Sequence, residues 1–346
     1  MFKKFSLILA ALVALTLTAQ ARIVLDTKDN KIEIPDKITY AMALVTPMVQ
    51  IAAMLGNDDK IISGSTKLPP IMTKIFPKIR TNNNPSGMMV SSVEAIIAAK
   101  PQVVFGPTDY LLGEQGTKQL RAAGIPVVNT VAFRNIASIE EIKQSVTLIG
   151  AIFGGESVKK AREFNAYFDE NVAFVQRRTA KVAKKKRVLV LDYKQGHYTT
   201  NEAGYMSAAF VAISGGENLS STASKEDMLS KYINEEQVIV YNPDVIITHT
   251  SEGREKILAN AALSRLKAVR EKQVFVVPSG IHIWSARSAE TALCPLWLGK
   301  VLYPELFKDI SIEQKTREFY KRFYNYDLNA DELKEILYPT KIYPAH

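Results

Sequence analysis

The fold of this chain is decided by residues 138–186, SIEEIKQSVTLIGAIFGGESVKKAREFNAYFDENVAFVQRRTAKVAKKK. Apolar residues recur there at steps of three and four, a spacing that predicts amphipathic helices. Gly154-Gly155 separates two such helices, because glycine commonly ends a helix. The second, predicted over 156–186, is long enough to connect two domains. Its basic end, residues 177–187, is typical of a solvated helix face, so we expect no nucleic-acid partner.

Strand and helix patterns alternate in the same order on both sides of this stretch. The predicted strands cover 40–45, 61–64, 103–105 and 127–128 before it and 188–191, 245–247 and 274–277 after it, with predicted helices at 48–55, 92–100, 116–123, 203–214, 236–242 and 255–266. Glu94 precedes Pro101 by the same interval that separates Glu236 from Pro243. This repeat predicts an α/β protein of two Rossmann-like lobes with mostly parallel sheets, joined by the long helix.

The first 21 residues have the pattern of a secretory signal peptide. Lys3 and Lys4 precede an apolar run over 7–17, and Ala19-Gln20-Ala21 follows it. The run is too short to span a membrane. We therefore expect cleavage after Ala21 and export to the periplasm. The mature chain would then consist of a first lobe over 22–155, the linking helix over 156–186, and a second lobe with C-terminal helices over 187–346.

Composition and motifs narrow the function. The chain is 47% hydrophobic and 23% charged, as folded domains are, and its net charge of +9 mildly favours anionic ligands. The single cysteine, Cys294, excludes an internal disulfide. No nucleophile-elbow, phosphate-loop, dinucleotide or H-E-x-x-H motif is present. We therefore expect a protein without enzymatic activity, and an exported metal-handling enzyme is a distant alternative.

Taken in order, these features resemble the helix-linked, or class III, periplasmic binding proteins. The stretch WLGKVLYPELF at 297–307 looks like that family, and the tail at 319–337 is similar to its C-terminal helices. The resemblance implies capture of a ferric siderophore, haem, cobalamin or nickel chelate for an ABC importer. It also implies that Glu94 and Glu236 meet basic pockets on the two permease subunits. Both glutamates equally suit the first turn of a helix, where the macrodipole favours acidic side chains.

Candidate ligand residues lie where the predicted strands end, because open α/β sheets bind ligands at that edge. They are Arg134 in the first lobe and His197, Tyr198, His249, His282, Trp284 and Arg287 in the second. Imidazole suits iron and nickel, an Arg fork binds carboxylates, and Trp presents a flat face to a ligand. Simpler structural alternatives are hydrogen bonding for each His, lobe packing for Trp284 and ion pairing for each Arg.

We therefore predict a monomeric periplasmic solute-binding protein with no permanently bound cofactor. It captures an anionic metal chelate, an iron complex of the siderophore type, and delivers it to the permease dimer of an ABC importer. His197, His249 and His282 would touch the chelate or complete its metal coordination. A nickel complex is the alternative cargo, followed by cobalamin or haem. Because one helix joins the lobes, we expect only a small rigid-body closure.

Overall fold

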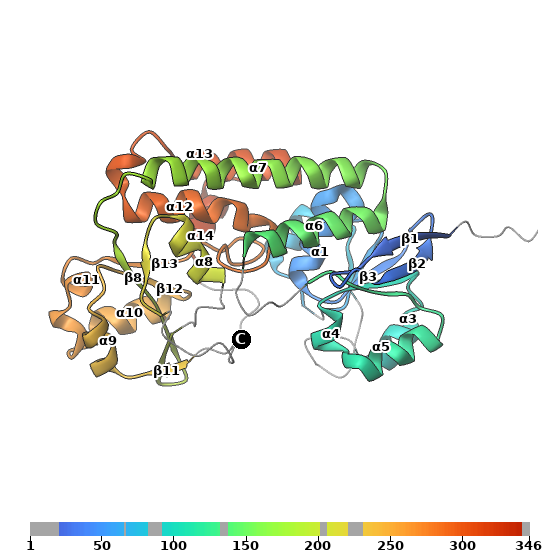
Figure 1. Ribbon diagram of the computed structural model, residues 1–346, viewed down its shortest axis with the longest axis horizontal. Helices are drawn as coiled ribbons and strands as arrows, with labels where there is room; N and C mark the ends of the chain where they lie inside the picture. The colour runs from blue at the N-terminus through green and yellow to red at the C-terminus, as the bar shows by residue number, and fades with distance from the viewer. Residues whose placement is uncertain are drawn as a thin grey trace, which may run out of the picture.

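The computed structural model describes residues 21–65, 67–81, 92–131, 138–200, 206–220 and 231–340. The predicted signal sequence before Ala21 and the candidate ligand residue Arg134 lie outside these ranges. Within them, no helix is both long enough and apolar enough to cross a membrane. Figure 1 shows two α/β lobes beneath a layer of long helices.

The first lobe is built on a five-stranded parallel sheet in the order β5-β4-β3-β6-β7. Its strands are β3 (Ala41–Ala43), β4 (Ile61–Ser63), β5 (Arg80–Thr81), β6 (Val103–Gly106) and β7 (Val127–Asn129). The connecting helices are α1 (Thr46–Ala52), continued by a π-helical turn (Ala53–Asn57), α2 (Pro70–Ile75), α3 (Val93–Ala99), α4 (Thr108–Leu111) and α5 (Gly113–Ala122). An antiparallel hairpin of β1 (Ala21–Leu25) and β2 (Lys31–Pro35) precedes them. The parallel α/β unit predicted from the sequence is confirmed.

The second lobe has a mixed sheet in the order β11-β9-β8-β12-β13, with β10 also pairing β8. Its strands are β8 (Arg187–Lys194), β9 (His197–Thr200), β10 (Glu217–Asn218), β11 (Lys231–Ile233), β12 (Val245–Thr248) and β13 (Val274–Val276). Its helices are α8 (Met206–Ile213), α9 (Glu235–Tyr241), α10 (Ser251–Ala259), a 3-10 turn (Leu263–Arg265) and α11 (Lys267–Arg270). The predicted helix over 255–266 is interrupted, because the Asn260 side chain accepts from the backbone N–H groups of Ala262 and Leu263.

The paired helices α3 and α9 end in the same way, as the repeat predicts. Their last residues are followed by Lys100 and Asn242, which adopt left-handed conformations with φ of 49° and 43°. Pro101 and Pro243 come next and prevent the helix from continuing. A parallel strand then begins two residues later in each lobe. The two lobes therefore share one local design at equivalent positions.

The linking helix α7 (Glu156–Thr179) is 24 residues long, about 36 Å at 1.5 Å per residue. It follows α6 (Ile139–Phe153), and Gly154, with φ of 70°, ends that helix as predicted. The prediction that the linking helix reaches residue 186 is wrong: it stops at Thr179. Beyond Thr179 the chain leaves the helix toward β8, and the Lys186 N–H donates to the Tyr303 hydroxyl at 3.0 Å just before that strand starts.

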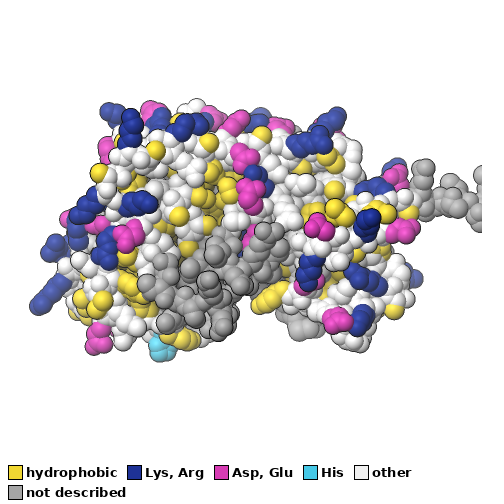
Figure 2. Space-filling model, viewed as in Figure 1, with side chains coloured by type: hydrophobic (Ala, Val, Ile, Leu, Met, Phe, Trp, Pro, Cys, Tyr) yellow, Lys and Arg dark blue, Asp and Glu magenta, His cyan; other side chains and the backbone are white. Residues whose placement is uncertain are grey.

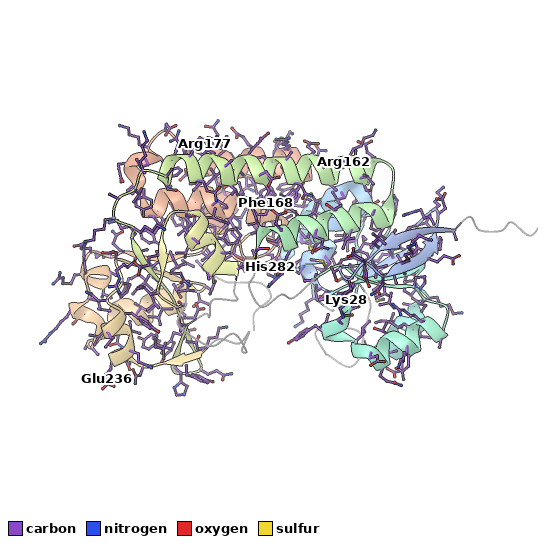
Figure 3. The ribbon with its side chains drawn as sticks, in the orientation of Figure 1. Lys28, Arg162, Phe168, Arg177, Glu236 and His282 are labelled. Carbon is purple, nitrogen blue, oxygen red and sulfur yellow. The ribbon has the colours of Figure 1, made fainter. Side chains whose placement is uncertain are left out.

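The lobes are joined by a packed helical body, defined here as α6, α7, α12 (Cys294–Leu302) and α13 (Ile312–Tyr324). Short helices at Ala289–Leu293 and Pro304–Leu306 and the C-terminal α14 (Ala330–Leu337) complete this part of the chain. Phe168 on α7 points into this body (Figure 3) and is fully buried. One continuous apolar cluster includes Phe168 together with residues of both lobes, such as Ile51 and Val190. The lobes thus share a core, which opposes large relative movement.

Candidate ligand-binding site

The site predicted from the strand ends is centred on residues 279–288, which we call the binding loop. It follows β13 and carries His282, which lies between the two lobes in Figure 3. An isolated antiparallel bridge pairs Ser279 with Ile283, and the Trp284 N–H donates to the Pro278 carbonyl at 3.0 Å. The loop therefore lies at the lobe junction, as the strand-end argument predicts.

His249 is held in one orientation at the end of β12. Its Nδ1 lies 2.6 Å from Oδ2 of Asp192, its backbone N–H donates to Oδ1 of the same carboxylate, and its Nε2 lies 3.0 Å from the Ser285 hydroxyl. Burial alone raises the pKa of Asp192, but the His249 charge and these hydrogen bonds hold the pKa below its ordinary value. A carboxylate that holds one imidazole nitrogen also fixes the direction of the other. The arrangement aims Nε2 at the binding loop.

Arg287 forms an ion pair that connects the binding loop to the helical body. Its Nε donates to Oε2 of Glu141 at 2.9 Å, and Glu141 lies in the first turn of α6. The Glu141 side chain is 1% exposed, whereas that of Arg287 is 20% exposed. The ion pairing that the sequence left open for Arg287 is present, and the guanidinium is held at the lobe junction.

Two of the predicted ligand residues are buried. Trp284 has no exposed surface and belongs to the shared core, so the prediction that it presents a flat face to a ligand is wrong. Its indole N–H has no hydrogen-bond partner in the described part of the chain. Tyr198 is 6% exposed and packs in a separate core on the outer side of the second lobe. Its hydroxyl accepts from Asn260 at 3.0 Å, so the structure gives it a packing role.

His197 lies apart from the strand ends that carry His249 and the binding loop. It is exposed at the start of β9, just after the tight turn at Gln195-Gly196, whose φ angles are 50° and 87°. That turn makes β9 antiparallel to β8, a hairpin the sequence prediction missed. The ring of His197 packs edge-on against Tyr232. This contact places the ring on the outer β9–β11 ribbon.

The predicted three-histidine metal set is not assembled in this structure. Among the residues described, no group of three or more His, Cys, Asp or Glu side chains is placed to hold a metal ion. Sequence reasoning also missed the carboxylates that hold the candidate residues. Asp192 directly follows the predicted strand 188–191, so the strand-end rule could have found it. Glu141 gave no such signal, because its partner lies 146 residues away.

Glu94 and Glu236, the predicted docking residues, are exposed in the first turns of α3 and α9. The backbone N–H of Glu94 and the Ser92 hydroxyl hold the pKa of Glu94 below its ordinary value. Figure 3 shows Glu236 at the end of the second lobe farthest from α7.

On the face shown in Figure 2, Lys and Arg side chains lie over both lobes and the helical body. Their distribution agrees with a solvated surface.

Comparison with known proteins identifies relatives over nearly the whole chain. The family described as "Periplasmic binding protein" matches residues 43–280. The molybdate-binding protein MolA of Haemophilus influenzae is 26% identical, covering 94% of this chain and 98% of that protein. The structure of MolA bound to molybdate has a TM-score of 0.72 at 22% identity, covering 89% of this chain and 99% of the other. Helicobacter pylori CeuE, in a Ni-His complex, has a TM-score of 0.67 at 19% identity, covering 92% and 100%.

Proposed function

Because this chain belongs to the periplasmic binding proteins, of the helix-linked class that serves ABC importers, we propose that it carries an anionic metal complex to its permease. Members of this family bind solutes and are not enzymes. An iron chelate of the siderophore type is the first candidate cargo. Family membership leaves the chemistry of the cargo open.

The observation that carries the proposal is the set of hydrogen-bond donors at the lobe junction. The Arg287 guanidinium, the Ser285 hydroxyl and the His249 imidazole lie on the binding loop or directly beside it. Arg supplies a planar fork of donors that matches carboxylate and other oxyanion groups. Bare cations need several anionic or imidazole ligands together, and the described residues provide no such group. Carboxylates already orient Arg287 and His249, and we propose that the donor groups they hold in place serve a complex that is negatively charged as a whole.

Molybdate is the second candidate, favoured by the similarity to MolA over 94% of this chain. An oxyanion presents acceptor oxygens on all sides, and the same donors would bind it. The two candidates differ in size and in the number of contacts. They can therefore be separated by direct binding measurements.

We further propose that Glu94 and Glu236 orient the loaded protein on the permease. Both are exposed at equivalent positions of the two lobes, which suits a partner with two related subunits. Exposed charge pairs of this kind mainly set orientation and the association rate. Their contribution to cargo binding should be small.

Calorimetric titration tests the cargo proposal with three probes: ferric citrate, molybdate and nickel–histidine. Arg287→Ala and His249→Ala should each weaken binding of the correct probe by about 10- to 150-fold, the cost of losing a hydrogen bond to a charged group. Arg178→Ala is the control, because Arg178 on α7 also forms an ion pair, with Asp309, and its side chain is 28% exposed. Equal losses in Arg178→Ala and Arg287→Ala would refute a direct role for Arg287. Metal analysis of protein isolated from its own periplasm identifies the natural cargo.

A further inference from the structure

We propose that Glu290 is a positioning residue: it fixes the backbone of the binding loop and, with Gln50 and Tyr320, fastens that loop to the first lobe and the helical body. This inference rests on the proposed function, because the loop carries Arg287 and His282. Its structural part can be tested without any cargo.

Glu290 has no exposed surface, and both of its oxygens accept hydrogen bonds from the loop. The Ile281 N–H donates to Oε1 at 3.0 Å, and the His282 N–H donates to Oε2 at 3.0 Å. The Tyr320 hydroxyl of α13 also donates to Oε1. A carboxylate accepts with both oxygens, which an amide or a hydroxyl in the same place could not do. Glu290 therefore holds two consecutive peptide groups of the binding loop.

Gln50 extends this network into the first lobe. It is fully buried on α1, its Nε2 donates to the Tyr324 hydroxyl at 2.8 Å, and its Oε1 accepts from the Ala289 N–H at 3.2 Å. The peptide of Ala289 directly precedes Glu290, so the end of the loop is fixed from the first lobe. The ion pair of Arg287 with Glu141 on α6 connects the loop to the helical body as well.

Close packing at Gly280 shows that the network leaves no free space. A β-carbon at this position would collide with the Tyr320 hydroxyl and with Oε1 of Glu290. Neither atom can move away easily, because the Tyr320 hydroxyl and Glu290 Oε1 are hydrogen-bonded to each other. Only glycine allows the loop backbone to approach the carboxylate this closely.

Burying the Glu290 carboxyl group lowers the stability of the folded protein. Burial raises the pKa of Glu290 to about 7, although hydrogen bonds from Tyr320, His282, Ile281 and Gln50 oppose the shift. Well-packed apolar side chains often replace buried charged networks without loss of stability. A role in placing the loop explains why a carboxyl group stands there.

The hydrogen bonds of Glu290, Gln50 and Tyr320 also determine with which part of the protein the binding loop moves when the lobes shift relative to each other. It is fastened to α1, α6 and α13, whereas His249 reaches it from the second-lobe sheet through the Ser285 hydroxyl. A relative movement of the second-lobe sheet would thus change the distance between His249 and the loop. Cargo held by Arg287 and His249 would be held between two bodies although both residues follow strands of one lobe.

Amide hydrogen exchange on the cargo-free protein tests the positioning role. Above pH 7, where Glu290 is ionised, Glu290→Gln keeps the shape but offers one acceptor oxygen, so one of the two loop N–H groups loses its partner. We expect exchange at Ile281 and His282 to accelerate by at least about tenfold. Tyr320→Phe, a milder change that removes only a hydroxyl, should give a smaller acceleration at the same amides and serves if Glu290→Gln does not fold.

Asn57→Leu is the matched control. Asn57 is equally buried, and its side chain donates to the Ser157 hydroxyl of α7 at 2.9 Å, so this variant loses a buried polar contact elsewhere. It should not accelerate exchange at Ile281 or His282. Unchanged exchange in Glu290→Gln and Tyr320→Phe, or equal acceleration in Asn57→Leu, would overturn the proposal.

Binding of ferric citrate and molybdate separates this inference from the proposed function. If the wild type binds either probe, Glu290→Gln should weaken that binding about tenfold or more, while Asn57→Leu leaves it unchanged. Unaltered affinity in Glu290→Gln would overturn the link to the site. If neither probe binds the wild type and exchange still accelerates only in the loop variants, the cargo proposal fails and the positioning role is supported.

Discussion

The ion pair between Arg287 and Glu141 predicts an unequal response to removing either partner. Glu141 is nearly inaccessible, with 1% of its side chain exposed, whereas the Arg287 side chain is 20% exposed. Arg287→Gln therefore leaves a carboxylate that water cannot reach. Glu141→Gln instead leaves a guanidinium that can turn partly toward solvent. The first change should be the more destabilising.

Removing one partner of a buried ion pair costs about 3 to 5 kcal/mol. Water reaches part of Arg287 and weakens this ion pair. We therefore expect Arg287→Gln to lower the free energy of unfolding by about 3 kcal/mol, the lower end of that range. Glu141→Gln should cost about 1.5 kcal/mol, the value of one hydrogen bond to a charged group. The double variant should cost less than the sum, because two amides can hydrogen-bond to each other and no charge is left buried.

Urea unfolding followed by circular dichroism measures these differences. Glu140→Gln is the control, because Glu140 lies next to Glu141 on α6 with 68% of its side chain exposed. It should change the free energy of unfolding by less than about 0.5 kcal/mol. The reasoning is refuted if Glu141→Gln destabilises as much as Arg287→Gln, or if the two costs add in the double variant.

Further predictions concern docking, pH and motion. Glu94→Ala and Glu236→Ala should lower transport by reconstituted importer while leaving cargo affinity unchanged, and Glu313→Ala, on α13, should affect neither; a parallel loss of affinity would contradict the docking role. The folded protein keeps the Glu290 proton up to about pH 7, whereas the unfolded chain releases it near 4.5. The free energy of unfolding should therefore fall by up to about 3 kcal/mol between these values, and Glu290→Gln should flatten that slope. Small-angle scattering should show a nearly constant radius of gyration on cargo binding, and a large contraction would rule out the rigid helical body.

Local sequence signals explain why the fold could be predicted. The Gly154 break and the helix endings before Pro101 and Pro243 depend on backbone geometry that the residue type largely sets. The end of α7 at Thr179 depends on where β8 must enter its sheet, which is a tertiary requirement. The sequence pattern of the lysines after Thr179 continues the helical spacing, so it could not indicate that end.

Burial explains why the site was predicted only in part. Trp284 and Tyr198 follow predicted strands, as ligand residues do, but both side chains pack into apolar cores. A large aromatic residue buries more apolar area inside than in a wet cleft, and the sequence does not show which space is available. His249 and Arg287 remain at the lobe junction because buried carboxylates on other elements, Asp192 and Glu141, accept their hydrogen bonds. Those partners become visible only in three dimensions.

The three candidate groups at the lobe junction share one physical principle. Each is held by a buried carboxylate from a different element: Asp192 on β8 for His249, Glu141 on α6 for Arg287, and Glu290 for the backbone of His282. These acidic residues are at most 4% exposed, so water does not screen the interactions. Donors fixed before cargo arrives lose little conformational freedom on binding, and this lowers the cost of capture. In this chain the buried acids, more than the histidine count, therefore mark the lobe junction that we propose as the cargo site.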